Sequence, residues 1–178
     1  MSAQNARSIM DGESMRRCLN RISYEIIERN RDLSAITLVG VKRRGAVLAA
    51  RIAGMIESIE DVCPPVEQLD TSMFRDDLPV RPDRPESGIT VDLTSRVIII
   101  VDDVLHTGRT IRAAIEAVML SGRPRAIQLA VLVDRGHREL PFRPDYTGKN
   151  LPTSASERVE VLVAEYDGRE GVLISKTE

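Results

Sequence analysis

The sequence is poor in aromatic residues, and its charges nearly cancel. Five of the 178 residues are aromatic (three Tyr, two Phe and no Trp), and 25 basic residues oppose 27 acidic ones for a formal net charge of −2. Proteins that bind single-stranded nucleic acid by stacking need exposed aromatic side chains, and proteins that follow a phosphate backbone are usually basic. The composition argues against both classes, but a local basic patch on an acidic protein is compatible with it.

Cysteine is scarce and long apolar runs are absent. Cys18 and Cys63 lie 45 positions apart without a CxxC spacing, so they predict neither a zinc site nor a redox pair. No apolar run approaches the roughly 18–20 residues that a membrane-spanning helix needs, and the N-terminus lacks the basic-then-apolar order of a signal peptide. We therefore expect a cytoplasmic protein with no membrane partner, in which residues 1–178 form a single domain.

Apolar periodicity predicts helices and strands that alternate along the chain. Met15, Leu19 and Ile22 share one stripe of an amphipathic helix, and the apolar run at 96–101 is the clearest strand. The expected elements are a helix over 11–31, a strand over 35–41, a helix after Gly45, strands over 65–71 and 96–101, a helix between Gly108 and Gly122, a strand over 126–133, and a hairpin of 158–166 with 171–175. This order predicts an α/β fold with a largely parallel sheet and an antiparallel edge.

Three stretches are expected to lack regular structure. Residues 1–10 are polar and expected to be loose, residues 72–90 form a long polar loop with three prolines, and residues 134–157 are also loop-like. A loop as long as 72–90 in a small domain is typical of a functional flap, with a disordered insertion as the alternative. The apolar strand at 126–133 is expected to be exposed, which favours a dimer or a tetramer.

Three loops are expected to meet beyond the carboxyl ends of the parallel strands, where open α/β sheets bind their ligands. In the 102–110 loop, Gly108 lets the backbone approach an anion at a helix N-terminus, while Thr107 and Thr110 add hydroxyl donors. Asp102 and Asp103 can accept hydrogen bonds from a vicinal diol or help to hold a hydrated divalent cation. A phosphate at one end and a diol at the other describe a ribose 5-phosphate.

The other two loops are less specific. Lys42, Arg43 and Arg44 beside Gly45 suit a multiply charged anion such as pyrophosphate, or they form a solvated basic turn. The 134–141 loop has no chemistry that its spacing reveals. Neither a GxxxxGK[ST] nor a strand-linked GxGxxG pattern is present, so a P-loop and a dinucleotide fold are not supported. The alternative for 102–110 is an acidic pair that merely ends a strand and a Thr-Gly pair that caps a helix.

The sequence VIIIVDDVLHTGRT at 97–110 resembles the phosphoribosyl-pyrophosphate motif of the type I phosphoribosyltransferases. Further resemblance is to the bifunctional pyrimidine operon attenuation regulators, at 16–17, 22, 28–30, 39–42, 74–78, 122–124, 127–141 and 145–150. That family combines uracil phosphoribosyltransferase activity with UMP- or UTP-dependent binding to messenger RNA. The resemblance implies a mainly parallel twisted sheet flanked by helices, with a small hood at 134–157 and an antiparallel edge hairpin, and a homodimer or higher homo-oligomer.

The resemblance also implies roles for individual residues. Arg75, in a flexible loop at 72–90, would act in catalysis with Asp102 and Asp103, and Mg²⁺ would bind through the substrate near the two aspartates rather than through direct protein ligands. The substrates uracil and phosphoribosyl pyrophosphate would contact Lys42, Arg43, Arg44, Asp102, Asp103, Val104, Leu105, His106, Thr107, Gly108, Arg109, Thr110, Arg135 and Val159. His106 departs from the family, which often has an aromatic residue there.

A basic surface for RNA is the second implication of the resemblance. Its candidates are Arg16, Arg17, Arg21, Arg138, Arg143 and Lys149, together with Arg123 and Arg125. Asn20 and Tyr24 occupy the helix face that bears part of this surface in relatives. The alternative is that most of these cations are solvated or paired with acidic side chains.

The predicted function is thus transfer of a phosphoribosyl group to uracil, giving UMP and pyrophosphate, in a protein that also attenuates transcription of a pyrimidine operon. Two alternatives remain open from the sequence. One is a nucleotide-sensing RNA-binding regulator with vestigial catalysis, and the other is a phosphoribosyltransferase for a different base, such as a purine.

Overall fold

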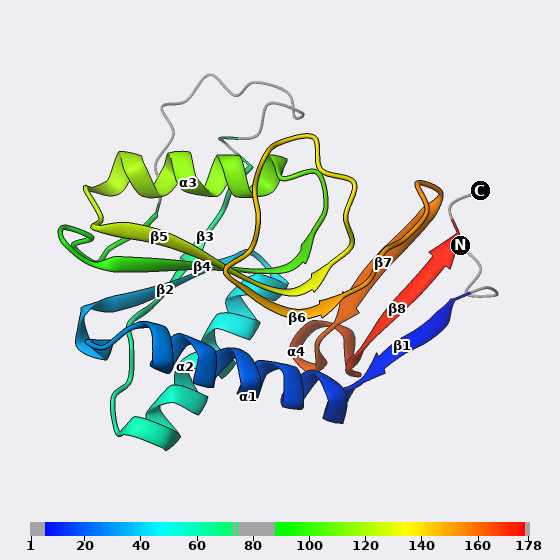
Figure 1. The fold of residues 1–178 in the computed structure, drawn as a ribbon, viewed down its shortest axis with the longest axis horizontal. Coiled ribbons are helices and arrows are strands. Elements are labelled where there is room, and N and C mark those ends of the chain that lie inside the picture. The colour runs from blue at the N-terminus through cyan, green and yellow to red at the C-terminus, as the bar shows by residue number, and fades with distance from the viewer. Residues whose placement is uncertain (1–5, 73, 75–87, 177–178) are drawn as a thin grey trace.

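The computed structural model describes residues 6–72, 74 and 88–176, and in that part of the chain the strands form two sheets (Figure 1). The elements in chain order are β1 (Arg7–Asp11), α1 (Gly12–Arg29), a 3₁₀ turn (Leu33–Ala35), β2 (Ile36–Val41), α2 (Arg44–Glu60), β3 (Val66–Leu69), β4 (Val97–Leu105), α3 (Arg109–Ser121), β5 (Ala126–Asp134), β6 (Tyr146–Asn150), β7 (Glu157–Leu162), α4 (Ala164–Asp167) and β8 (Gly171–Lys176).

The larger sheet is parallel throughout, with strand order β3-β2-β4-β5-β6, and helices cover both of its faces. Figure 1 shows α3 on one face and α1 and α2 on the other. Successive side chains of a strand point to opposite faces. Accordingly, Ile98 and Ile100 of β4 share a core cluster with α3, while Val97 and Ile99 pack with α1 and α2. This is the double burial that an almost wholly apolar parallel strand predicts.

The smaller sheet is antiparallel, with strand order β1-β8-β7, and lies at one end of the larger sheet (Figure 1). The predicted C-terminal hairpin is confirmed as β7 and β8, joined through the short helix α4. It belongs to this second sheet rather than to an edge of the parallel one. Val161, Val172 and Ile174 bury their side chains in the same cluster as α1, so the two sheets share one core.

The predicted fold class is confirmed, but four local predictions are wrong. Residues 7–11 are not loose, because β1 pairs with β8 across most of the chain length. The 134–157 stretch contains β6, which pairs with β5. As a result the 126–133 strand is an interior strand between β4 and β6, not an exposed one. The strand expected to end at residue 101 continues as β4 through the two aspartates to Leu105.

The predicted flexible loop at 72–90 falls mainly on residues 73 and 75–87, which lie outside the described residues.

Two glycines mark the contact between β2 and the start of α2. A Cβ atom on Gly40 would lie 2.4 Å from the Cα of Ala46, and one on Gly45 would lie 2.4 Å from the carbonyl oxygen of Val101. Both distances are below any tolerable carbon contact, so the backbone of α2 rests directly on the ends of β2 and β4. This approach places the loop before α2 beside the carboxyl end of β4.

We predict that Gly40→Ala lowers the free energy of unfolding by about 2 kcal/mol or more, because backbone must move to admit the methyl group. Gly54→Ala is the matched control: Gly54 is exposed on α2, and nothing lies within 4 Å of the position that its methyl group would occupy. That variant should gain roughly 0.5–1 kcal/mol from helix propensity. Urea unfolding measures both, and equal effects of the two substitutions would contradict the prediction.

Candidate active site

The candidate site lies where β4 ends and α3 begins. Asp102 is buried, with 6% of its surface exposed, and Asp103 is partly exposed. The N–H of Asp103 donates to Oδ1 of Asp102 at 2.9 Å, and the N–H of Val104 donates to Oδ1 of Asp103 at 2.9 Å. These local bonds orient the two carboxylates near the carboxyl end of β4, inside the strand rather than in the loop that the sequence predicted.

The turn after β4 presents backbone N–H groups at the start of α3. Gly108 is the N-cap residue, with φ of 94°, and has no side chain to cap the helix, while the N–H of Arg109 donates to Oγ1 of Thr107 in a long bond of 3.4 Å. A Cβ atom on Gly108 would also lie 3.0 Å from the Phe142 ring. The first N–H groups of a helix have no partner within the helix and favour an anion. Thr107 and Thr110 flank this turn and are partly exposed, so the arrangement fits a phosphate group.

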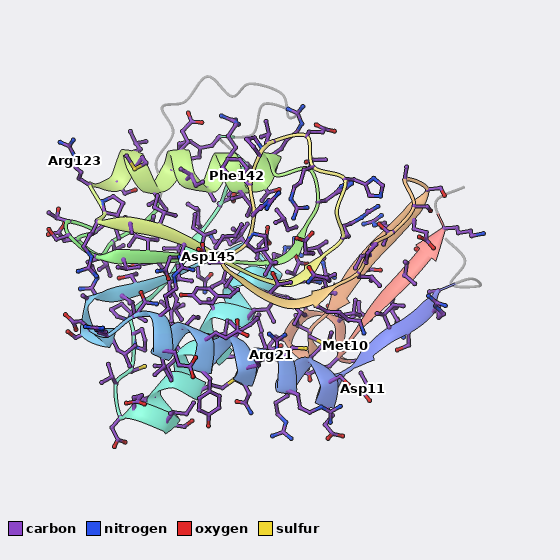
Figure 2. The ribbon with its side chains drawn as sticks, viewed as in Figure 1. Met10, Asp11, Arg21, Arg123, Phe142 and Asp145 are labelled. Atoms are coloured by element: carbon purple, nitrogen blue, oxygen red, sulfur yellow. The ribbon has the colours of Figure 1, made fainter. Side chains whose placement is uncertain are left out.

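The 134–142 loop is bonded to the same turn. The carbonyl of Thr107 accepts hydrogen bonds from the N–H groups of Glu139 and Leu140, each at 3.0 Å, and Nε of Arg109 donates to Glu139 at 2.7 Å. The N–H of Arg135 donates to the Leu105 carbonyl at 3.1 Å. Two of the three loops expected to meet at the site therefore form one hydrogen-bonded unit. Figure 2 shows Phe142 of this loop beside α3.

Arg135 is buried rather than open to the site. It is 7% exposed, and its guanidinium donates to Oγ1 of Thr153 at 3.1 Å and to the carbonyl of Glu157 at 2.6 Å. Burial lowers the pKa of this guanidinium below its ordinary value. Arg135 thus joins the end of β5 to the start of β7, on which Val159 is also buried. Both predicted base-binding residues are therefore buried rather than exposed to solvent.

The third loop, 42–44, contains two exposed cations and one that is paired. Lys42 and Arg43 are exposed and are joined by a cis peptide bond, whereas Arg44 forms an ion pair with Asp167 of α4. The Gly45 contact with Val101 brings this loop next to the two aspartates. The structure therefore brings together the residues predicted at 42–45, 102–110 and 134–140, while Arg75 lies outside the described residues.

Sequence reasoning missed the side chains that hold these loops in place. Glu139, Thr153 and Asp167 each accept a hydrogen bond from an arginine at the site, yet none lies in a pattern that spacing could reveal. Only the alternating charges of the Asp-Arg-Gly-His-Arg-Glu sequence at 134–139 gave a signal, and it did not identify the partners.

The predicted RNA-binding cations lie in different settings. Arg17 pairs with Glu13, and Arg21 pairs with Glu25 while also donating to the carbonyls of Thr147 and Gly148 in β6. The Arg138 guanidinium turns inward, donating to the carbonyls of His106 and Phe142 and pairing with Asp134.

The remaining cations are Arg16, Arg143, Lys149, Arg123 and Arg125, and all five are exposed. Arg143 lines a hollow of about 540 Å³ that also includes Thr147 and Asn150 of β6. In Figure 2 Arg123 lies at the opposite end of α3 from Phe142, so within one chain it lies apart from this group. Among the helices that the structure describes, none combines the length and apolar character of a membrane span.

Comparison with known proteins defines the class first. The family model for the phosphoribosyl transferase domain matches residues 5–165. A hypoxanthine phosphoribosyltransferase from Trypanosoma cruzi superposes with a TM-score of 0.76 at 18% identity over 95% of this chain and 94% of its own. One from Staphylococcus aureus gives a TM-score of 0.72 at 15% identity over 100% and 98%. The chain belongs to the phosphoribosyltransferase family.

Curated relatives narrow this class further. The bifunctional protein PyrR of Limosilactobacillus fermentum is 52% identical, covering 94% of this chain and 96% of its own length. The proteins of the same name from Enterococcus faecalis and Streptococcus pneumoniae are each 51% identical over 96% of this chain and 97% of their own. The chain is thus a member of the PyrR family, and the family predicted from the sequence is confirmed.

His106, in the turn after β4, gives this site a measurable pH signature. It and His137 are the two histidines of the chain, with ring centroids 6.1 Å apart in an edge-to-face arrangement. Burial, followed by the charge of Arg135, lowers the pKa of His106 below 6.5. The folded protein therefore binds a proton here less readily than the unfolded chain does, so stability is lost as pH falls from above 6.5 toward the folded-state pKa.

We predict that the His106 imidazole titrates below pH 6.5 in an NMR titration, with the His137→Gln variant identifying its signal. The free energy of unfolding should be measured at about pH 7.5 and about pH 5.5, on either side of the ordinary histidine pKa. It should fall less between these two pH values for His106→Gln than for the parent protein. A His106 midpoint above 6.5 would contradict the expected burial of this ring.

Proposed function

We propose that this protein transfers the phosphoribosyl group of phosphoribosyl pyrophosphate to uracil, giving UMP and pyrophosphate, and that it binds the leader of a pyrimidine operon messenger RNA in response to UMP or UTP. The observation that carries the proposal is the pair Asp102 and Asp103, held at the carboxyl edge of the sheet directly before the Gly108 turn at the start of α3. We also propose one phosphoribosyltransferase domain over 1–178, acting in the cytoplasm as a homodimer or higher homo-oligomer.

The ribose 5-phosphate fits the turn between β4 and α3. The phosphate would accept hydrogen bonds from the backbone at 107–110, with Thr107 and Thr110 adding hydroxyl groups, and the ribose hydroxyls would donate to Asp102 and Asp103. Val104 and His106 are partly exposed before this turn, while the side chain of Leu105 is buried in the core cluster that packs with α3, so Leu105 would contribute backbone only. Arg109, paired with Glu139, fixes the edge of the turn. Held at both ends, the sugar has its anomeric carbon oriented for attack.

The pyrophosphate is proposed to lie between the two aspartates and the 42–44 loop. Lys42 and Arg43 are exposed cations beside the carboxyl end of β4, suited to a polyanion. The resemblance assigns Arg75 to the same leaving group. Displacement of pyrophosphate builds negative charge on the leaving group and positive charge on the ribose ring, so these cations and aspartates stabilise opposite parts of the transition state.

The chemistry of Asp102 and Asp103 fits Mg²⁺ bound largely through the substrate. Within the described residues no cluster of three or more His, Cys, Asp or Glu side chains could hold a metal unaided. Mg²⁺ commonly uses one or two carboxylates together with substrate phosphates and water. When bound, it would neutralise charge on the pyrophosphate.

The base is proposed to lie against the wall formed by Arg135 and Val159. The Arg135 guanidinium is engaged in the Thr153 and Glu157 contacts, so it shapes this wall while backbone groups nearby recognise the uracil edge. The hypoxanthine enzymes named above share the fold at 15–18% identity and carry no evidence about the base. The PyrR relatives favour uracil over a purine.

RNA is proposed to contact the exposed cations around β6. Arg143 and Lys149 are exposed there, beside the hollow lined by Thr147 and Asn150, and Arg21 lies against the same strand. Arg17 extends this surface along α1, one turn before Arg21, and Arg138 supports it from within the 134–142 loop. Arg16 lines a separate hollow between α1 and α2, so it would reach the same RNA only from there. Exposed cations that contact phosphates release counterions, which makes such binding salt-dependent.

We predict that Asp103→Asn reduces kcat/KM for UMP formation by about 10- to 100-fold, because it removes the charge while leaving an oxygen to accept from the Val104 N–H. A radiolabelled-uracil assay measures the loss. Asp92→Asn is the matched control, since Asp92 is exposed before the opposite end of β4. No UMP from the parent protein would remove the catalytic half of the proposal, and an unaffected Asp103→Asn would remove the assigned role.

We predict that Arg143→Gln and Lys149→Gln each weaken binding of a pyrimidine-operon leader transcript in the presence of UMP. Each should reduce the slope of log affinity against log salt by about 1. Gel-shift titrations at several salt concentrations measure this, with Arg123→Gln, at the far end of α3, as control. No shift by the parent protein at any UMP concentration would remove the RNA half of the proposal.

A further inference from the structure

Arg44 stands next to the proposed pyrophosphate loop but directs its guanidinium elsewhere. It is the first residue of α2, directly after Lys42 and Arg43. Its Nε donates to Oδ2 of Asp167 at 3.3 Å and its Nη2 donates to Oδ1 at 2.9 Å, so the contact is bidentate. Glu160 adds a longer ion pair at 3.8 Å. Two parallel hydrogen bonds fix the orientation of the guanidinium as well as its distance from the carboxylate, whereas a lysine ammonium would fix only the distance.

Asp167 is itself fixed by a second bond. It is the last residue of α4, the short helix between β7 and β8, and its Oδ2 accepts from the N–H of Val163 at 2.9 Å. Burial opposes ionisation of Asp167, but the Val163 N–H and the Arg44 guanidinium outweigh it and place the pKa of this carboxyl below 3.8. One carboxylate thus closes the turn of the antiparallel sheet and holds the start of α2.

The antiparallel sheet leads from this carboxylate to the wall for the base. β7 runs from Glu157, whose carbonyl accepts from the Arg135 guanidinium, through Val159 to Leu162 at the α4 turn. The hairpin of β7 and β8 joins the base-binding end of β7 to Asp167, and the Arg44 ion pair joins Asp167 to the 42–43 loop. The main sheet also connects the two sites through backbone, by the Lys42 N–H bond to the Leu69 carbonyl before the loop and by the Gly45 contact with β4 after it.

We propose that Arg44 is a positioning residue that acts through Asp167, holding the pyrophosphate loop in register with the wall that receives the base, rather than a ligand of pyrophosphate. This inference rests on the proposed function. It reassigns Arg44 from the substrate contacts that the sequence indicated. Its consequence is that Arg44 and Asp167 act as one unit. Loss of either side chain should therefore weaken the binding of phosphoribosyl pyrophosphate as much as loss of both.

A second ion-pair group between α2 and the antiparallel sheet provides a control. Two turns further along α2, Arg51 pairs with Glu165 and Glu170, which flank Asp167 on the α4 side and the β8 side. This second ion-pair group also joins α2 to the antiparallel sheet, but it lies away from the 42–43 loop. Its loss should weaken the fold without moving the loop.

The test compares Arg44→Gln, Asp167→Asn, the double variant, Arg44→Lys and Arg51→Gln by steady-state kinetics. We expect Arg44→Gln and Asp167→Asn each to raise KM for phosphoribosyl pyrophosphate about five- to tenfold with a smaller change in kcat, and the double variant to match the single ones. Arg44→Lys, which keeps the charge but not the two-bond geometry, should fall between. Arg51→Gln should lower the melting temperature while leaving KM within about twofold.

Two results would overturn the proposal. If Arg44→Gln raises KM while Asp167→Asn does not, Arg44 binds the substrate directly, and if neither raises it, the ion pair positions nothing. Asp167→Asn keeps an oxygen for the Val163 N–H, and circular dichroism at the assay temperature verifies that each variant is folded. If the parent protein makes no UMP, the proposed catalytic function is wrong, but the role of Arg44 can still be tested. Calorimetric titration with magnesium pyrophosphate then compares the affinities of the same variants.

Discussion

Burial of β4 on both faces is the constraint on which the rest of the structure depends. A strand whose residues 97–101 are all buried needs a helix layer on each side, and α3 and the α1–α2 pair supply them. Asp102 and Asp103 come next in the same strand, ahead of the buried Leu105, and solvent first reaches the strand at Asp103. Ionised groups are costly to bury without partners. The two aspartates therefore lie at the boundary of the core, where a site that needs them is expected.

Close backbone contacts then bring the other loops to that edge. Gly40 and Gly45 allow α2 to start directly on β2 and β4, and Gly108 allows the turn before α3 to pack under Phe142. Side chains at these positions would separate the loops by the width of a methyl group or more. The polar contacts among the loops depend on this approach, since hydrogen bonds of the 134–142 loop to the Thr107 carbonyl need both backbones within 3.0 Å.

Elements with a strong local pattern could be predicted from the sequence, and those defined by distant partners could not. Alternating or continuous apolar residues located β2, β4, β5 and the three long helices to within a few residues. β6, with the sequence Tyr-Thr-Gly-Lys-Asn, has no apolar pattern and is a strand only because β5 offers it an edge. β1 likewise depends on β8. At the site, the acidic pair and the Gly108 turn were evident, but Arg44 and Arg138 were not separable from free cations, because their partners come from other parts of the chain.

The 134–142 loop connects the two proposed activities. On one side it is bonded to the turn that would hold the ribose phosphate, through Glu139, Leu140 and Arg138. On the other side Arg138 and Arg143 line the hollow beside β6, where RNA is proposed to bind. If the proposed UMP- or UTP-dependent RNA binding holds, linkage requires that RNA in turn strengthen nucleotide binding at the turn that this loop contacts. Arg138, which pairs with Asp134 and donates to the His106 carbonyl, therefore ties this loop to the turn after β4 while it also lines the hollow beside β6.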